Sequence, residues 1–111
     1  EFTLKSEVSL TFTTDVTLPI FTTSEYRSAK ILIQTSSNGG DYEITEVTCI
    51  VDDSDNAYFS ESSDVFTSQK IVEYSMSVTA GVLNITVSKV PGYTGTATQF
   101  TSKISKTSIR K

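Results

Sequence analysis

The chain has 111 residues, a net charge of −4 and 37% apolar residues, enough for one hydrophobic core and too little for two. It contains no histidine and one cysteine, which excludes Ser-His-Asp and Cys-His nucleophiles, histidine-containing metal sites and an internal disulfide. The acidic balance disfavours nucleic acid as a partner, and no apolar run approaches the roughly 18 residues of a membrane span.

Alternating apolar residues predict strands from the start of the chain. Even-numbered apolar positions run from Leu4 to Ile20, which indicates one half-buried strand or two strands in line. Pro19 suggests an edge or an end. Residues 26–35 alternate again, with Ala29, Ile31 and Ile33 on one face, and the Asn-Gly-Gly sequence within 36–41 predicts a turn.

The strand predicted over 42–52 changes its alternation partway. Tyr42 and Ile44 are even-numbered, whereas the later apolar residues are odd-numbered, so we expect a bulge near Thr45-Glu46 or burial on both faces. An acidic turn follows at 52–56. A short strand is then expected over 57–62 and a turn at 63–64, and residues 65–67 fit no single pattern.

The clearest hairpin lies in the last third of the chain. Residues 72–78 and 83–87 alternate on either side of Thr79-Ala80-Gly81, and a last strand is expected over 96–104 with Phe100 and Ile104 inward. About eight strands with closely spaced turns predict a single all-β domain over residues 1–111, an antiparallel β-sandwich or a jelly-roll-like fold. Its predicted core contains Ile31, Ile33, Val47, Cys49, Val51, Val72, Tyr74, Met76, Leu83, Ile85 and Val87.

Few side chains suggest chemistry. The acidic turn has oxygen ligands suited to a cation, but Asp and Asn are also common in plain hairpin turns, which is the preferred interpretation. Glu43 and Glu46 are a carboxylate pair of the kind that hydrolyses glycosidic bonds, yet a spacing of three places them on opposite faces of a strand. Cys49 lies in an apolar run and is expected to be a buried, unreactive thiol. We therefore expect no catalytic residues, no cofactor and no metal.

Charge is segregated along the chain. No Lys or Arg occurs between Ile31 and Gln69, whereas the last nine residues are rich in them. This pattern fits a solvated surface with a frayed basic end, or a basic end that contacts an acidic neighbour, for example in a head-to-tail assembly of copies. The candidate assembly contacts are Asp52, Asp53 and Asp55 in the acidic turn and Lys103, Lys106, Arg110 and Lys111 at the basic end.

Five tyrosines offer a further binding hypothesis. Tyrosine presents a flat apolar ring with a polar tip, so Tyr26, Tyr42, Tyr58, Tyr74 and Tyr93 would suit a sugar-binding face. The alternation instead predicts that several of them, such as Tyr42 and Tyr74, are buried. Core or interface packing is therefore the preferred interpretation.

The order of short motifs in the middle of the chain resembles a known family. Tyr26-Arg27-Ser28-Ala29-Lys30 is followed by Gly40-Asp41-Tyr42, by Glu46-Val47, and by Asn56-Ala57-Tyr58-Phe59-Ser60-Glu61 after the acidic turn. This order resembles a β-rich module in virion structural proteins of tailed bacteriophages, particularly marine cyanophages. The likeness covers residues 26–90 and extends towards residue 104.

The resemblance implies a non-enzymatic virion component. It would be a capsid decoration, baseplate or tail-fibre module, assembled in the host cytoplasm with other virion proteins and with copies of itself. It supplies no catalytic residues. The alternative is a recognition module that binds a host-surface glycan, in the manner of an adhesin.

Overall fold

Strands of eight to twelve residues make up most of the chain. The computed structural model describes the backbone of residues 2–111 and the side chains from residue 7 onward. In this range there is no helix, and hence none that could span a membrane. The strands are β1 (Phe2–Phe12), β2 (Asp15–Thr22), β3 (Tyr26–Ser37), β4 (Tyr42–Val51), β5 (Ala57–Phe66), β6 (Val72–Thr79), β7 (Val82–Lys89) and β8 (Phe100–Arg110).

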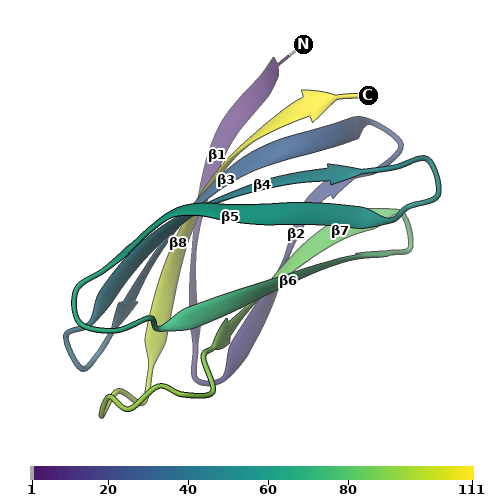
Figure 1. Ribbon diagram of the computed structural model, residues 1–111. Coiled ribbons are helices and arrows are strands. Elements are labelled where there is room, and N and C mark those ends of the chain that lie inside the picture. Colours follow the sequence, from purple (N-terminus) through teal and green to yellow (C-terminus); the bar gives the residue numbers. More distant parts are fainter. Residues whose placement is uncertain (1) are drawn as a thin grey trace.

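The strands form two antiparallel sheets of unequal width (Figure 1). The wider sheet, called sheet A, has five strands in the order β1-β8-β3-β4-β5, and sheet B has three in the order β2-β7-β6. Their inward side chains form one apolar cluster between the sheets. The all-β antiparallel sandwich predicted from the sequence is confirmed.

The core follows the predicted alternation closely. Ten of the eleven predicted core residues are buried, and Met76 is only partly buried at the margin of the core. Phe100 and Ile104 point inward as expected, at 1% and 2% exposure. The alternation alone does not predict that Ile20 and Phe21 are both buried. A register irregularity between Pro19 and Phe21 turns these two successive side chains inward.

The first two strands lie in different sheets. The interpretation as one strand, or as two in line, is wrong, because the chain turns between β1 and β2 and passes from sheet A to sheet B. Pro19 lies in β2, which is an edge strand of sheet B, so the edge position predicted from this proline is confirmed.

The alternation does not change within β4. Glu43 and Thr45 are buried, and they continue the inward face of Val47, Cys49 and Val51. Tyr42 is therefore 52% exposed, and its predicted burial is wrong. The expected bulge exists in the neighbouring strand.

That bulge lies in β5, which is a single strand of ten residues. The register with β4 shifts between Ile44 and Glu46 because β5 carries an extra residue, and Ser63 there has a φ of 54°. The short strand and turn predicted over 57–64 are therefore replaced by one bulged strand, which also includes Val65 and Phe66.

The last strand begins later than predicted. Residues 96–99 precede it in a loop that is tied to the β3–β4 turn, where the side chain of Asn38 accepts bonds from the backbone N–H groups of Thr98 and Gln99. β8 then runs to Arg110 between β1 and β3. The predicted hairpin of β6 and β7 is confirmed, and its turn places Ala80 and Gly81 at positive φ.

Candidate functional site

The acidic turn is closed by its own hydrogen bonds. Asp52 Oδ1 accepts bonds from the backbone N–H groups of Ser54 and Asn56, both at 2.9 Å, and Oδ2 accepts one from the Asn56 side chain at 3.0 Å. The bonds from Asn56 hold the pKa of Asp52 below its ordinary value. In the described part of the chain, no group of three or more His, Cys, Asp or Glu side chains is arranged to hold a metal ion. The carboxylate of Asp52 thus acts as a turn-forming group.

The acidic turn also meets basic groups of the same chain. Arg27 donates to Asp53 Oδ1 at 2.8 Å and to the carbonyl of Val51 at 3.0 Å. The pKa of Asp53 is lowered by Arg27 first and by Lys111 second. Asp55 is exposed at a φ of 61°. The last residue of the basic end therefore lies near the acidic turn of the same molecule, whereas Lys103 lies opposite Gln34, farther along the sheet. Contact of either charge group with a second copy stays a prediction.

The basic end is not frayed, so that interpretation is wrong. Lys103, Lys106 and Arg110 belong to β8, which pairs along its length with β1 and with β3. Lys103 is exposed, whereas Lys106 is half-buried and donates to the carbonyl of Ile20 in sheet B. Burial lowers the pKa of Lys106.

The last two residues are also held in place. The guanidinium of Arg110 lies 5.1 Å from the ring centroid of Tyr26, and the backbone N–H of Lys111 donates to Glu25. Removing the segment from Lys106 onward would therefore take away half of a central strand. Assembly hypotheses for this end must be tested with point substitutions.

The tyrosines do not share one face. Tyr74 is buried in the core, Tyr26 packs on Phe21, and Tyr93 packs edge-on against Phe100. Only Tyr42 and Tyr58 are exposed, at opposite ends of β4 and its neighbour β5. A single aromatic platform for a sugar ring is not formed by these five residues.

The largest unpredicted feature is a one-sided distribution of exposed apolar side chains. Among the side chains from residue 7 onward, every exposed large hydrophobic lies in sheet A and none in sheet B. Sheet B instead turns hydroxyl and amide groups outward, as at the Thr17–Thr86 pair, whose oxygens are 2.9 Å apart. The exposed residues are Leu32, Tyr42, Ile50, Tyr58, Phe59, Val65, Phe66 and Ile109.

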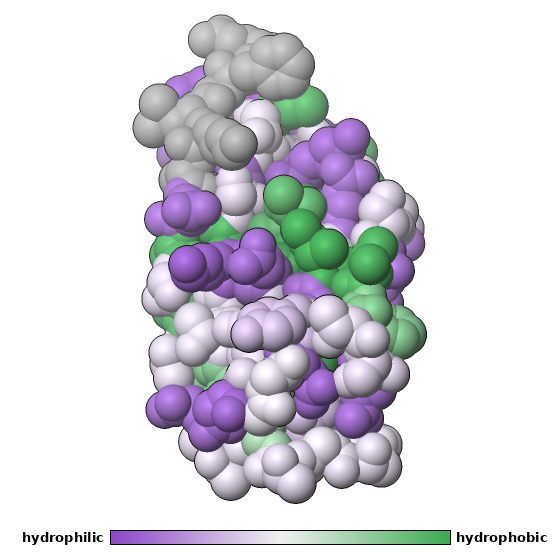
Figure 2. All heavy atoms as spheres, turned by 90° about the vertical axis from the view of Figure 1, so that its left-hand side faces the viewer, coloured by the Kyte–Doolittle hydropathy of each residue, from purple (hydrophilic) through white to green (hydrophobic). Residues whose placement is uncertain are grey.

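Six of these residues lie on the outer face of sheet A, the face that points away from sheet B, whereas Phe59 and Phe66 point inward on the edge strand β5. One row crosses four strands and has a small serine at its centre, so that apolar side chains flank a shallow depression. It consists of Tyr58, Ile50, Ser28 and Ile109. A second apolar group, Tyr42, Ile44 and Val65, lines a depression of about 250 Å³ at the other end of β4. Figure 2 shows one side of the molecule, on which apolar side chains form a patch between hydrophilic ones.

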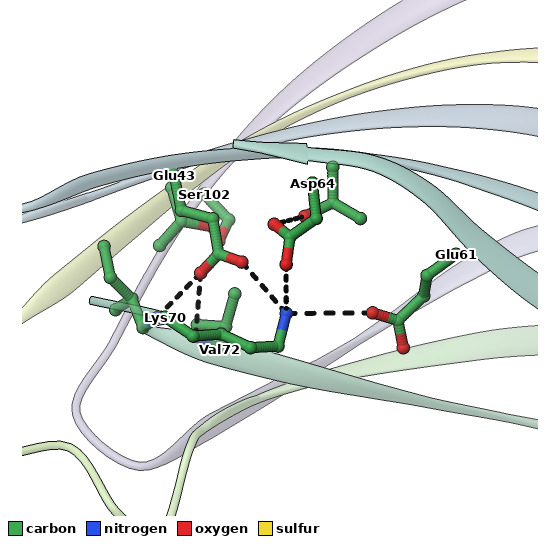
Figure 3. A network of polar contacts seen from close by, with 9 residues as sticks. Glu43, Glu61, Asp64, Lys70, Val72 and Ser102 are labelled. Atoms are coloured by element: carbon green, nitrogen blue, oxygen red, sulfur yellow. Dashed lines mark hydrogen bonds and ion pairs between the residues drawn. The ribbon is translucent and has the colours of Figure 1, made fainter. Parts of the chain in front are cut away.

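A partly buried ion network joins the two sheets at the inner side of β5 (Figure 3). Lys70, just before β6, lies 2.9 Å from carboxylate oxygens of both Glu43 and Asp64, and 3.7 Å from Glu61. The other oxygen of Glu43 accepts bonds from the backbone N–H groups of Ile71 and Val72, at 2.7 and 3.2 Å. Glu43 is therefore a fully satisfied buried carboxylate that orients the start of β6.

The charged groups of this network shift one another's pKa values. Burial, and next the neighbouring Asp64, raise the pKa of Glu43. The pKa of Asp64 is lowered, since bonds with Glu43, Lys70 and Thr45 outweigh its partial burial. Burial opposes the charge on Lys70, but its pairing with Asp64 and Glu43 prevails and raises the pKa of Lys70. Glu46 lies on the opposite face of β4, so the paired carboxylates considered from the sequence are not brought together.

These shifts predict an unusual dependence of stability on pH. Because the pKa of Glu43 is raised, its contribution is complete below its unfolded pKa of about 4.3 and is lost as pH rises through the folded value. Lowered pKa values, as at Asp64, act in the opposite direction and remove stability as pH falls below about 3.9. We expect the free energy of unfolding to rise as pH falls from 7 towards about 4.3, measured by urea denaturation.

Glu43→Gln is the matched control for this pH dependence. The amide keeps an acceptor for Ile71 and Val72 but has no charge to titrate, so the variant should lose this rise of stability on acidification. Glu46→Gln, on the outer face, should keep it. An identical pH profile in the wild type and in Glu43→Gln would contradict the assignment.

No family model and no curated protein matches the chain. The likeness to phage virion modules thus depends on the sequence motifs alone. The geometry described above presents an asymmetric apolar surface on sheet A, which is the candidate contact surface.

Proposed function

We propose that the chain is a non-enzymatic structural module of a tailed-bacteriophage virion, which acts by assembling with other virion proteins and with copies of itself. The observation that carries this proposal is the one-sided surface: the exposed large apolar side chains belong to sheet A, while sheet B is polar. Exposed apolar patches of this kind usually mark protein contacts. The resemblance of the motifs over residues 26–90 to phage virion modules is the reason for placing this assembly in a virion.

The composition is compatible with that setting. A hydroxyl-rich sandwich whose single cysteine is buried needs no oxidising compartment to fold, which suits assembly in a host cytoplasm. Binding to neighbours also stabilises the folded form of a small domain, because it favours the native state by mass action. A capsid decoration, a baseplate part and a tail-fibre part all meet these conditions.

The test is whether the chain is part of purified particles. Virions of the phage that encodes it should yield its peptides by mass spectrometry in a fixed ratio to the major capsid protein. Virions produced with Val65→Lys, which places a charge on the sheet A surface where the side chain is 63% exposed, should contain less of it. Ser75→Lys, at an exposed position of sheet B, is the matched control and should be incorporated normally.

Two results would overturn the proposal. The first is absence of the chain from purified virions while it accumulates in infected cells. The second is saturable binding of the isolated chain to a glycan array, with incorporation unaffected by Val65→Lys, which would favour the host-glycan recognition module.

A further inference from the structure

The unequal widths of the two sheets leave two strand edges uncovered. β1 and β5 are the edge strands of the five-stranded sheet, and only three strands face them from sheet B. The inward side chains of β5 consequently remain accessible, with Phe59 at 38% and Phe66 at 45% exposure. On β1 the inward side chains of Val8 and Leu10 are half-buried. Both edges therefore combine free backbone groups with apolar side chains on the inner face.

The β5 edge has few of the features that prevent strand addition. Edge strands are usually protected by Lys, Pro, bulges or inward charges. β5 contains neither Lys nor Pro, and its inward Glu61 and Asp64 are paired with Lys70. The bulge at Ser63 interrupts only the middle of the strand. By contrast, the edge strand β2 of sheet B carries Pro19.

Charge distinguishes the two edges of sheet A. The strands β4 and β5 contain carboxylates and neither Lys nor Arg, and Glu43, Glu61 and Asp64 outnumber Lys70, the lysine that pairs with them. The β1 side lies next to β8, which carries the exposed Lys103 beside Ser9 and the half-buried Lys106 beside Ser6. Two β5 edges would therefore bring like charges together, whereas a β5 edge and a β1 edge bring opposite charges together.

We propose that the β5 edge of one copy docks along the β1 edge of the next, so that sheet A continues from molecule to molecule. This inference rests on the proposed function, since it names a second copy as one of the assembly partners. Four antiparallel steps separate β1 from β5, so the two strands run in the same direction and pair in parallel across the contact. The contact is head-to-tail, which closes into a ring or extends as a filament.

The interface has an apolar and an electrostatic part. Phe59 and Phe66 of one copy would cover Val8 and Leu10 of the next, which removes exposed apolar surface on both inner faces. Lys103 lies on the outer face of sheet A, whereas Glu61 and Asp64 lie on its inner face and are paired with Lys70, so the opposite charges of the two edges would attract at a distance and would not form direct ion pairs. Such attraction contributes specificity more than affinity, and it weakens at 1 M salt, where the screening length is about 3 Å.

Single cysteines provide a test that distinguishes the arrangements. Ser9 on β1 and Ser62 on β5 are exposed on the outer face of sheet A, so each tolerates cysteine. The native Cys49 does not interfere, because it is 2% exposed and burial raises the pKa of its thiol to about 11. The four samples are Ser9→Cys, Ser62→Cys, their mixture and the double variant, each treated with a short bis-maleimide.

The head-to-tail arrangement predicts a specific pattern. Each single variant stays uncrosslinked, the mixture gives dimers with one chain of each kind, and the double variant gives a ladder of higher multimers. Phe66→Lys should abolish the ladder, while Ser75→Lys on sheet B should leave it unchanged. Raising the salt to 1 M should weaken the ladder severalfold.

Other patterns overturn the inference. Dimers from Ser62→Cys alone would show that two β5 edges pair about a two-fold axis, and monomers in all four samples would show that no edge contact forms. Either result leaves the proposed function standing if the chain is still found in virions. Conversely, a ladder together with absence from virions would retain the edge contact and refute the virion function.

Discussion

Lys70→Met should lower the free energy of unfolding by about 3 kcal/mol, because it leaves the buried Glu43 carboxylate without its cation. The side chain of Glu43 is 0% exposed, whereas those of Lys70 and Asp64 are 32% and 28% exposed. Water at the two partly exposed groups keeps the effect at the lower end of the range for buried ion pairs. Urea denaturation at pH 7 measures it.

Two further variants identify the cause of this loss. Lys89→Met removes an exposed lysine at the end of β7 and should change stability by less than about 0.5 kcal/mol. Lys70→Met combined with Glu43→Gln should recover part of the lost stability, because the buried group is then neutral. Equal losses from Lys70→Met and Lys89→Met would mean that the ion network contributes little.

Phe100→Ala should cost about 4 kcal/mol, through the lost burial and the cavity that remains. The ring is 1% exposed and lies 5.6 Å, between centroids, from both Phe12 and Tyr93. It thereby holds the end of β1, the start of β8 and the loop between β7 and β8 together. The expected result is a large shift of the urea midpoint.

Phe66→Ala is the matched control, because it removes the same side chain from a position that is 45% exposed. It should cost less than about 1 kcal/mol. If the β5 edge binds a second copy, this variant should also reduce self-association, so stability and assembly would respond to different phenylalanines. A destabilisation comparable to that of Phe100→Ala would contradict the placement of Phe66 at the edge.

The sequence predicted well those strands whose inward positions are all apolar. In β6 and β7, Val72, Leu83, Ile85 and Val87 alternate without interruption, and all are buried. Prediction failed in β4, because the inward Glu43 pairs with Lys70, which lies 27 residues away in the chain. No local sequence pattern indicates that pairing. The same limit applies to the start of β8, since the residues before it donate backbone hydrogen bonds to the distant Asn38.

The candidate contact surface could be predicted only in part. In β5, apolar residues occupy both faces, as the neighbours Tyr58 and Phe59 illustrate. Such a run is typical of a strand buried on both sides as well as of an uncovered edge strand. The difference depends on the number of strands in the opposite sheet, which is a property of the whole fold. Charge segregation, by contrast, was visible directly in the sequence.

The pairing of the first and last strands affects how the molecule would carry a pulling force. β1 and β8 are antiparallel neighbours, and Phe2 lies opposite Ile109, so both chain ends leave the sheet at the same place (Figure 1). Tension applied through these ends would open the β1–β8 ladder one hydrogen bond at a time, which resists force less than shearing many bonds at once. A module of this shape is poorly suited to bear load along its own chain. In an assembly under stress, the load would have to pass through its lateral contacts.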